Sequence, residues 1–317
     1  MRRTCLDMVY ELARKNERVV FIGSDLGPGV LDDMRTEMPH RFFMEGVSEA
    51  NIIGMAAGLA MDGYIPYVNT IATFLTRRCF EQISMDLCLH NLPVRLIANG
   101  GGLVYAPLGP THIAIDDIGL MRTQPNMTVV SPSDADEMRH LMPETLDWNG
   151  PMYIRLGKGG DPVISHGNPA FKIGKGIILR PPTKITLAAA GIMSGKALEA
   201  ANILNERGTS CGVVHFPTIK PLDVELVRDL AEMSDVIVTL DEHLLNNGLG
   251  TAILETLSDA GSAPLPTIRR LGIQDQFTRH YGSQDTLLEE FGLQPHQIAE
   301  EVERTAREAQ AINGGMQ

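Results

Sequence analysis

The sequence lacks three kinds of segment that are typical of other protein classes. It has no run of basic residues, and its formal net charge of −12 argues against nucleic acid or an anionic membrane as a partner. It has no apolar stretch long enough to span a bilayer, and its first 15 residues lack the apolar centre of a signal peptide. Its four cysteines do not have metal-ligand spacing, so we expect reduced thiols in a cytoplasmic protein.

Apolar, strand-like runs alternate with helical patterns along the chain, which is typical of parallel α/β units. We expect two doubly wound α/β domains, at residues 1–165 and 184–317, joined by a Gly/Pro-rich linker at residues 166–183. The chain has 317 residues, of which 44% are hydrophobic, so it is long enough to form two substantial cores.

A single acid, Glu49, precedes a nearly chargeless helix pattern that is rich in Ala, Gly and Met. Burying a carboxylate at such a position is costly unless a polar group receives it, and we expect that group to belong to a ligand. The alternative interpretation is an ordinary acid at a helix N-terminus, where the helix dipole favours negative charge.

Two further motifs follow. Residues 73–82 read Thr-Phe-Leu-Thr-Arg-Arg-Cys-Phe-Glu-Gln, with aromatic residues whose spacing, taken alone, is equally typical of a helix facing a core. Residues 109–112 read Gly-Pro-Thr-His and follow both an apolar strand pattern and a glycine triplet. A neutral imidazole can donate and accept a proton near neutral pH, so His112, one of nine histidines, is chemically able to act as an acid or a base.

Together these motifs resemble the transketolase family of thiamine diphosphate enzymes. In that family the matching acid hydrogen-bonds the cofactor's aminopyrimidine ring and favours its imino tautomer, while the matching histidine faces the cofactor's reactive carbon. The resemblance implies catalytic roles for Glu49 and His112, and a pyrimidine face covered by Phe74 and Arg77. It implies cofactor contacts for this set of residues: Asp25, Leu26, Glu49, Phe74, Arg77 and Phe80.

The motif that holds the cofactor's diphosphate in this family, Gly-Asp-Gly with a downstream Asn, does not occur in the sequence. That motif also binds Mg²⁺, which requires oxygen ligands in near-octahedral geometry. The resemblance therefore implies a partner, the N-terminal half of a transketolase, which holds Mg²⁺ and shares thiamine diphosphate with this chain. We expect a heterotetramer with two copies of each subunit and no metal ligand in this chain.

The expected reaction is transfer of a two-carbon unit from a ketose or 2-oxo donor to an aldehyde acceptor, with His112 also contacting the substrate. Transketolases usually place an acid where this chain has Leu108, and sugar-phosphate contacts of the relatives fall on Gly100 and Gly101. Arg155 matches a phosphate-binding arginine of the family. We predict a roomier pocket that is less selective for phosphate, with Arg155 binding any anionic group that the substrate carries.

Two alternatives stay open at this point. The beta subunit of a 2-oxoacid dehydrogenase shares the Glu-Ala-Asn run and the C-terminal domain, and co-purifying lipoyl-domain proteins would identify it. A non-catalytic assembly subunit could keep the same fold, since fold alone does not prove activity. The joint presence of Glu49, Phe74 and His112 argues against this second alternative.

Overall fold

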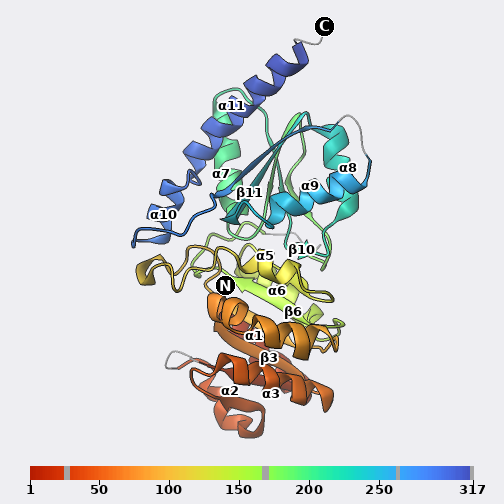
Figure 1. The fold of residues 1–317 in the computed structure, drawn as a ribbon, viewed down its shortest axis with the longest axis vertical. Coiled ribbons are helices and arrows are strands. Elements are labelled where there is room, and N and C mark those ends of the chain that lie inside the picture. The colour runs from red at the N-terminus through yellow and green to blue at the C-terminus, as the bar shows by residue number, and fades with distance from the viewer. Residues whose placement is uncertain (25–28, 166–170, 262–264, 315–317) are drawn as a thin grey trace.

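The computed structural model describes residues 1–24, 29–165, 171–261 and 265–314. Two α/β domains are stacked along the long axis of the molecule, and the C-terminal helix extends beyond the second domain (Figure 1). This arrangement confirms the predicted fold class. In the described part of the chain, no helix combines the length and the apolar character needed to cross a membrane.

The first sheet has seven strands in the order β10-β5-β6-β4-β3-β1-β2, and all neighbouring pairs are parallel except β10 with β5. The central strands are buried along nearly their whole length because helices cover both faces of the sheet. The strand bounds are β1 (Val19–Gly23), β2 (Phe42–Met44), β3 (Ile65–Ile71), β4 (Arg95–Asn99), β5 (Thr128–Val130), β6 (Met152–Leu156) and β10 (Thr218–Lys220).

Side chains of the first sheet alternate between two helical layers. Ile97 in β4 packs with α1 and α6, whereas its neighbours Leu96 and Ala98 pack with α3 on the other face. Helix α6 begins after Asp134, whose side chain caps it by accepting hydrogen bonds from the backbone N–H groups of Asp136 and Glu137. The helix bounds are α1 (Arg2–Lys15), α2 (Asp32–Glu37), α3 (Glu49–Met61), α4 (Phe80–Gln82), α5 (Asp117–Arg122) and α6 (Ala135–Glu144), with short turns η1 (Pro39–Arg41), η2 (Phe74–Arg78), η3 (Ile83–Cys88) and η4 (Ala106–Leu108).

The second sheet has five strands in the order β12-β11-β8-β9-β7, of which only β7 pairs in an antiparallel manner. Helices α7 and α11 cover one face, and helices α8 and α9 cover the other. The bounds are β7 (Ile177–Arg180), β8 (Ile185–Ala189), α7 (Met193–Glu206), β9 (Gly212–His215), α8 (Val224–Met233), β11 (Val236–Leu244), α9 (Leu249–Asp259), β12 (Thr267–Ile273), α10 (Gln284–Glu290) and α11 (Pro295–Gly314).

The two domains are joined by more than a linker. Strand β7 lies inside the predicted linker at residues 166–183, yet it pairs with β9 in the second sheet. Strand β10 lies inside the predicted second domain, yet it pairs with β5 in the first sheet. One hydrophobic cluster also runs through both domains, with Ile53 and Leu87 at one end and Val214 and Ile253 at the other. The exact domain bounds stay a prediction.

Candidate active site

Three candidate residues follow the carboxyl ends of strands in the first sheet. Glu49 is the first residue of α3, soon after β2, and Phe74 opens the turn η2 after β3. His112 lies between β4 and α5, on a segment that begins with the glycine triplet. Because the carboxyl ends of parallel strands meet at one edge of the sheet, these segments converge where α/β proteins bind ligands.

A chain of contacts joins these three side chains through Arg78. Glu49 is buried, with 2% of its surface exposed, and its Oε2 accepts a hydrogen bond of 2.6 Å from Arg78 Nη1. The Arg78 guanidinium lies over the Phe74 ring, 4.4 Å from the ring centroid. The His112 ring meets Phe74 edge-on at a centroid distance of 5.2 Å. The structure therefore brings together the acid, the aromatic ring and the histidine that were selected from the sequence.

The arginine that stacks on Phe74 in this structure is Arg78, and the role predicted for Arg77 at the pyrimidine face stays a prediction. Arg77 forms a bidentate ion pair with Asp116, with N···O distances of 2.9 Å, whereas its neighbour Arg78 covers Phe74. Phe74 and Arg78 are four residues apart, a spacing that places side chains on one helix face. That spacing is the signal that could have identified Arg78.

The other predicted cofactor contacts are less informative. Phe80 is half-buried and packs against the large hydrophobic cluster, and no described contact joins it to Phe74. Asp25 and Leu26 lie outside the described residues. The roles assigned to these three residues stay predictions.

The glycine loop corrects the expectation of a roomier pocket. A side chain at Gly100 would overlap the ring of Tyr105, and a side chain at Gly101 would overlap the Arg155 side chain. A side chain at Gly102, whose φ is +69°, would overlap Glu242. The space that these glycines leave is therefore filled by larger side chains of this chain. Leu108, at the end of η4, is 48% exposed.

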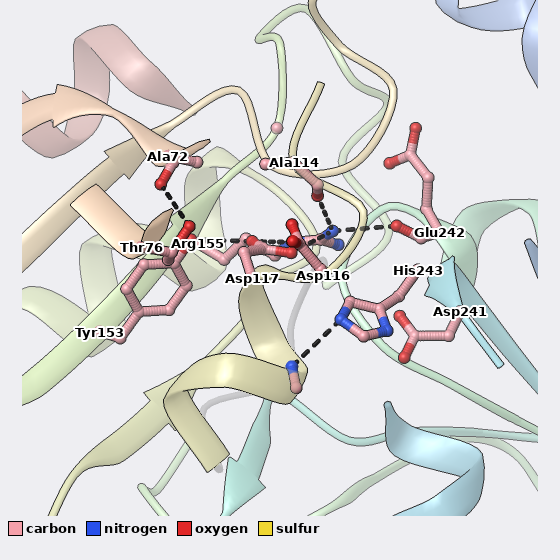
Figure 2. A network of polar contacts seen from close by, with 12 residues as sticks. Ala72, Thr76, Ala114, Asp116, Asp117, Tyr153, Arg155, Asp241, Glu242 and His243 are labelled. Carbon is pink, nitrogen blue, oxygen red and sulfur yellow. Dashed lines mark hydrogen bonds and ion pairs between the residues drawn. The ribbon is translucent and has the colours of Figure 1, made fainter. Parts of the chain in front are cut away.

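Arg155 lies in a buried polar network rather than on an open surface (Figure 2). Its guanidinium donates to both carboxylate oxygens of Asp117, at 2.8 and 3.0 Å, and to the backbone carbonyls of Ala114 and Glu242. Burial raises the pKa of Asp117, but the Arg155 guanidinium outweighs burial and holds that pKa below its ordinary value. To bind a substrate anion, Arg155 would have to give up some of these bonds, so its substrate contact stays a prediction.

Two adjacent residues of β11 connect the domains beside this network. Glu242 Oε1 accepts hydrogen bonds from the Leu103 backbone N–H at 2.9 Å and from Gln284 Nε2 at 2.7 Å. Burial raises the pKa of Glu242 to about 7, against the opposing effect of Arg155. His243 Nε2 accepts a bond from the backbone N–H of Gly119, and its Nδ1 donates to a backbone carbonyl. His243 thus ties β11 to the backbone of α5, whereas no local sequence pattern indicates the role of Glu242.

Comparison with known proteins identifies the family. The family described as "Transketolase, pyrimidine binding domain" matches residues 1–160, and "Transketolase, C-terminal domain" matches residues 174–298. The chain belongs to the transketolase family. This result confirms the interpretation of the sequence as a member of the transketolase family.

Several transketolase relatives match the chain over most of its length. It is 35% identical to the 6-deoxy-6-sulfo-D-fructose transketolase subunit SqwH of Clostridium sp. (strain MSTE9), covering 97% of this chain and 94% of the relative. It is also 35% identical to an apulose-4-phosphate transketolase subunit of Phocaeicola vulgatus, covering 92% of this chain and 93% of the relative. A solved structure described as a split gene transketolase, inactive beta4 tetramer, matches with a TM-score of 0.87 at 35% identity. The match covers 96% of this chain and 97% of the solved chain.

The extent of these matches indicates a subunit of the split type. The chain spans about half the length of the curated 1-deoxy-D-xylulose-5-phosphate synthases it matches, for example 46% of the synthase from Heliobacterium modesticaldum. It spans nearly the full length of the relatives that are themselves called subunits. The chain is therefore similar to subunits of divided transketolases over nearly their whole length.

The residues present fit one part of the cofactor that transketolases use, thiamine diphosphate. The flat guanidinium of Arg78 lies against the Phe74 ring, and the buried Glu49 carboxylate lies at the edge of that guanidinium. An aminopyrimidine ring requires the same two groups, an aromatic face and an acid at its polar edge. Among the described residues, His, Cys, Asp and Glu side chains form no group of three or more that could hold a metal ion.

Proposed function

We propose that this chain is the half of a split transketolase that binds the pyrimidine ring of thiamine diphosphate. A second subunit holds the diphosphate and Mg²⁺, and the working enzyme contains two copies of each subunit. The observation that carries the proposal is the cluster of Glu49, Phe74 and His112 at the carboxyl edge of the first sheet. The solved relative described as an inactive beta4 tetramer supports the need for a second kind of subunit.

In this proposal Glu49 would hold the pyrimidine ring by a hydrogen bond and would exchange a proton with it. The carboxylate is shielded from water, so a hydrogen bond that it makes to a ring nitrogen is stronger than the same bond in solution. When bound, thiamine diphosphate supplies the carbanion chemistry of two-carbon transfer. Phe74 orients the ring by stacking, since aromatic faces favour offset contact with flat groups.

His112 is the proposed proton carrier on the substrate side. Its Nδ1 lies 2.9 Å from the hydroxyl of Thr111, which leaves Nε2 to exchange a proton with the substrate. The edge-on contact with Phe74 fixes the imidazole ring beside the proposed pyrimidine position. His112 therefore helps to hold a proton near the oxygen on which charge develops.

The proposed substrates are a donor and an acceptor other than the common pentose phosphates. Leu108 presents an apolar, 48% exposed side chain where the resemblance expects an acid that binds a donor hydroxyl. The two subunit relatives carry the names of a sulfonated sugar and of apulose 4-phosphate, which supports a modified sugar. A steady-state comparison of modified ketoses with xylulose 5-phosphate tests this, and a clear preference for xylulose 5-phosphate would refute it.

Calorimetric titration tests the proposed division of the cofactor site. We expect the isolated chain to bind thiamine diphosphate weakly or not at all. Tight, Mg²⁺-dependent binding should appear only after the partner subunit is added. Sub-micromolar binding to the isolated chain would contradict the proposal.

A further inference from the structure

The guanidinium of Arg78 occupies the space between the two groups that would bind the pyrimidine ring. It lies 4.4 Å from the centroid of Phe74, and its Nη1 donates to Glu49 Oε2 at 2.6 Å. One flat group thus stacks on the aromatic ring and bonds to the buried carboxylate at the same time.

An aminopyrimidine ring would use these same two surfaces. It is also flat, it would stack on Phe74, and its polar edge would face the Glu49 carboxylate. The guanidinium and the ring cannot both occupy this space, since each needs the face of Phe74 and the same carboxylate oxygen. We infer that Arg78 occupies the pyrimidine position in the isolated chain and must leave it before the cofactor binds. This inference rests on the proposed function of the site.

The surroundings of the two charges explain why Arg78 can act as a removable occupant. The Glu49 side chain is 3% exposed, so the carboxylate requires a hydrogen-bonding partner. The Arg78 side chain is 47% exposed, so its guanidinium can swing into solvent without losing the hydration of its charge. The carboxylate therefore keeps Arg78 in place until another polar group replaces it.

This competition lowers the affinity of the isolated chain for the ring. Only the fraction of molecules in which Arg78 has swung out can bind it, and the apparent affinity falls in proportion to that fraction. A partner subunit that holds the diphosphate would raise the local concentration of the ring enough to displace Arg78. Arg78 is thus a positioning residue that protects Glu49 and couples cofactor binding to assembly.

The neighbouring Arg77 provides a matched comparison. It has the same side chain and stands next in sequence, but its guanidinium is held by Asp116 through two N–H groups. Removing Arg77 therefore leaves the contact between Arg78 and Glu49 in place. If Arg77 instead occupied the pyrimidine position, its removal would change the affinity for the ring more than the removal of Arg78.

The experiment uses the full chain without its partner and a probe that needs no diphosphate site. The probe is the aminopyrimidine half of thiamine, as its hydroxymethyl alcohol, and binding is followed by ligand-detected NMR titration. We expect Arg78→Ala to bind the probe at least tenfold more tightly than the wild-type chain. Arg35→Ala, which removes an exposed guanidinium that lies over a different ring, Phe42, should bind it like the wild type. The affinity of Arg78→Lys for the probe should lie between those of Arg78→Ala and the wild type, because lysine keeps the charge but not the flat group.

Equal or weaker binding by Arg78→Ala, relative to the wild type, would overturn the inference, as would a larger gain in Arg77→Ala. Circular dichroism checks that each variant is folded, and Arg78→Lys replaces Arg78→Ala as the decisive variant if the alanine chain does not fold. Titration of thiamine diphosphate into the assembled complex separates the two hypotheses. If the complex binds the cofactor while Arg78 has no effect on the probe, only the inference fails, whereas no binding to the complex refutes the proposed function.

Discussion

The buried carboxyl group of Glu242 makes the stability of the fold depend on pH. Burial raises its pKa from an ordinary value of 4.5 to about 7, although Arg155 and the hydrogen bonds from Gln284 and Leu103 favour the charged form. Between these two pH values the folded chain holds a proton that the unfolded chain has already released. The contribution of Glu242 to the free energy of unfolding therefore falls as the pH rises from 4.5 to 7, and it levels off above pH 7.

The size of this effect follows from the two pKa values. At about 1.4 kcal/mol per pH unit, the difference between 4.5 and about 7 is worth about 3 kcal/mol. Glu242→Gln removes the charge and keeps an oxygen that can accept both hydrogen bonds. We expect the variant to be more stable than the wild type by up to about 3 kcal/mol at pH 8, with little difference near pH 4.5.

Urea unfolding at several pH values between 4.5 and 8 measures this difference directly. Glu290→Gln is the matched control, because Glu290 is an exposed acid on α10, close in sequence to Gln284. The control should have the same free energy of unfolding as the wild type at every pH. A gain in Glu242→Gln that is the same at pH 4.5 and pH 8, or a loss at pH 8, would show that the Glu242 carboxyl is not held neutral by burial.

Three further outcomes are expected. Gly101→Ala should destabilise the chain by about 1–3 kcal/mol in a thermal unfolding experiment, because the new methyl group overlaps Arg155. Its control is Gly54→Ala in α3, where the added carbon meets no atom within 4 Å outside its own helix backbone, and which should be neutral or slightly stabilising. Asp117→Asn should cost about 3–5 kcal/mol in the free energy of unfolding, since it leaves the Arg155 charge buried without its anion, and a cost near zero would contradict the described network. Glu49→Gln in the assembled enzyme should still bind cofactor but lose about two to four orders of magnitude in turnover, and an unchanged rate of hydrogen–deuterium exchange at the thiazolium carbon would refute its assigned role.

The sequence predicted the parts of this fold and site that depend on local pattern. Alternating strand and helix patterns are enough to predict two α/β domains, and the resemblance of three motifs to the transketolase family is what placed Glu49, Phe74 and His112 in one site. The sequence did not indicate that Arg78 lies over Phe74, because the position of Arg77 depends on its ion pair with Asp116, which is set by tertiary structure, and the role of Arg77 at the pyrimidine face stays a prediction.

Long-range packing also explains the remaining differences. The absence of side chains at the glycine triplet suggested empty space, but the residues that fill it come from other segments, such as Arg155 and Glu242. Strands β7 and β10 were missed because three or four residues carry too little periodic signal in regions rich in turns. Both strands owe their existence to the edge of a sheet that the rest of the chain has built.

The crossing of β10 into the first sheet limits where this polypeptide can be divided. Cutting the chain at residue 183 would remove β10 and leave β5 as an unpaired edge, while also opening the hydrophobic cluster shared by both domains. A fragment of this kind presents an aggregation-prone surface instead of an independent domain. We therefore expect the two α/β domains to unfold as one cooperative unit, and a gene divided at the interdomain linker not to encode two stable halves.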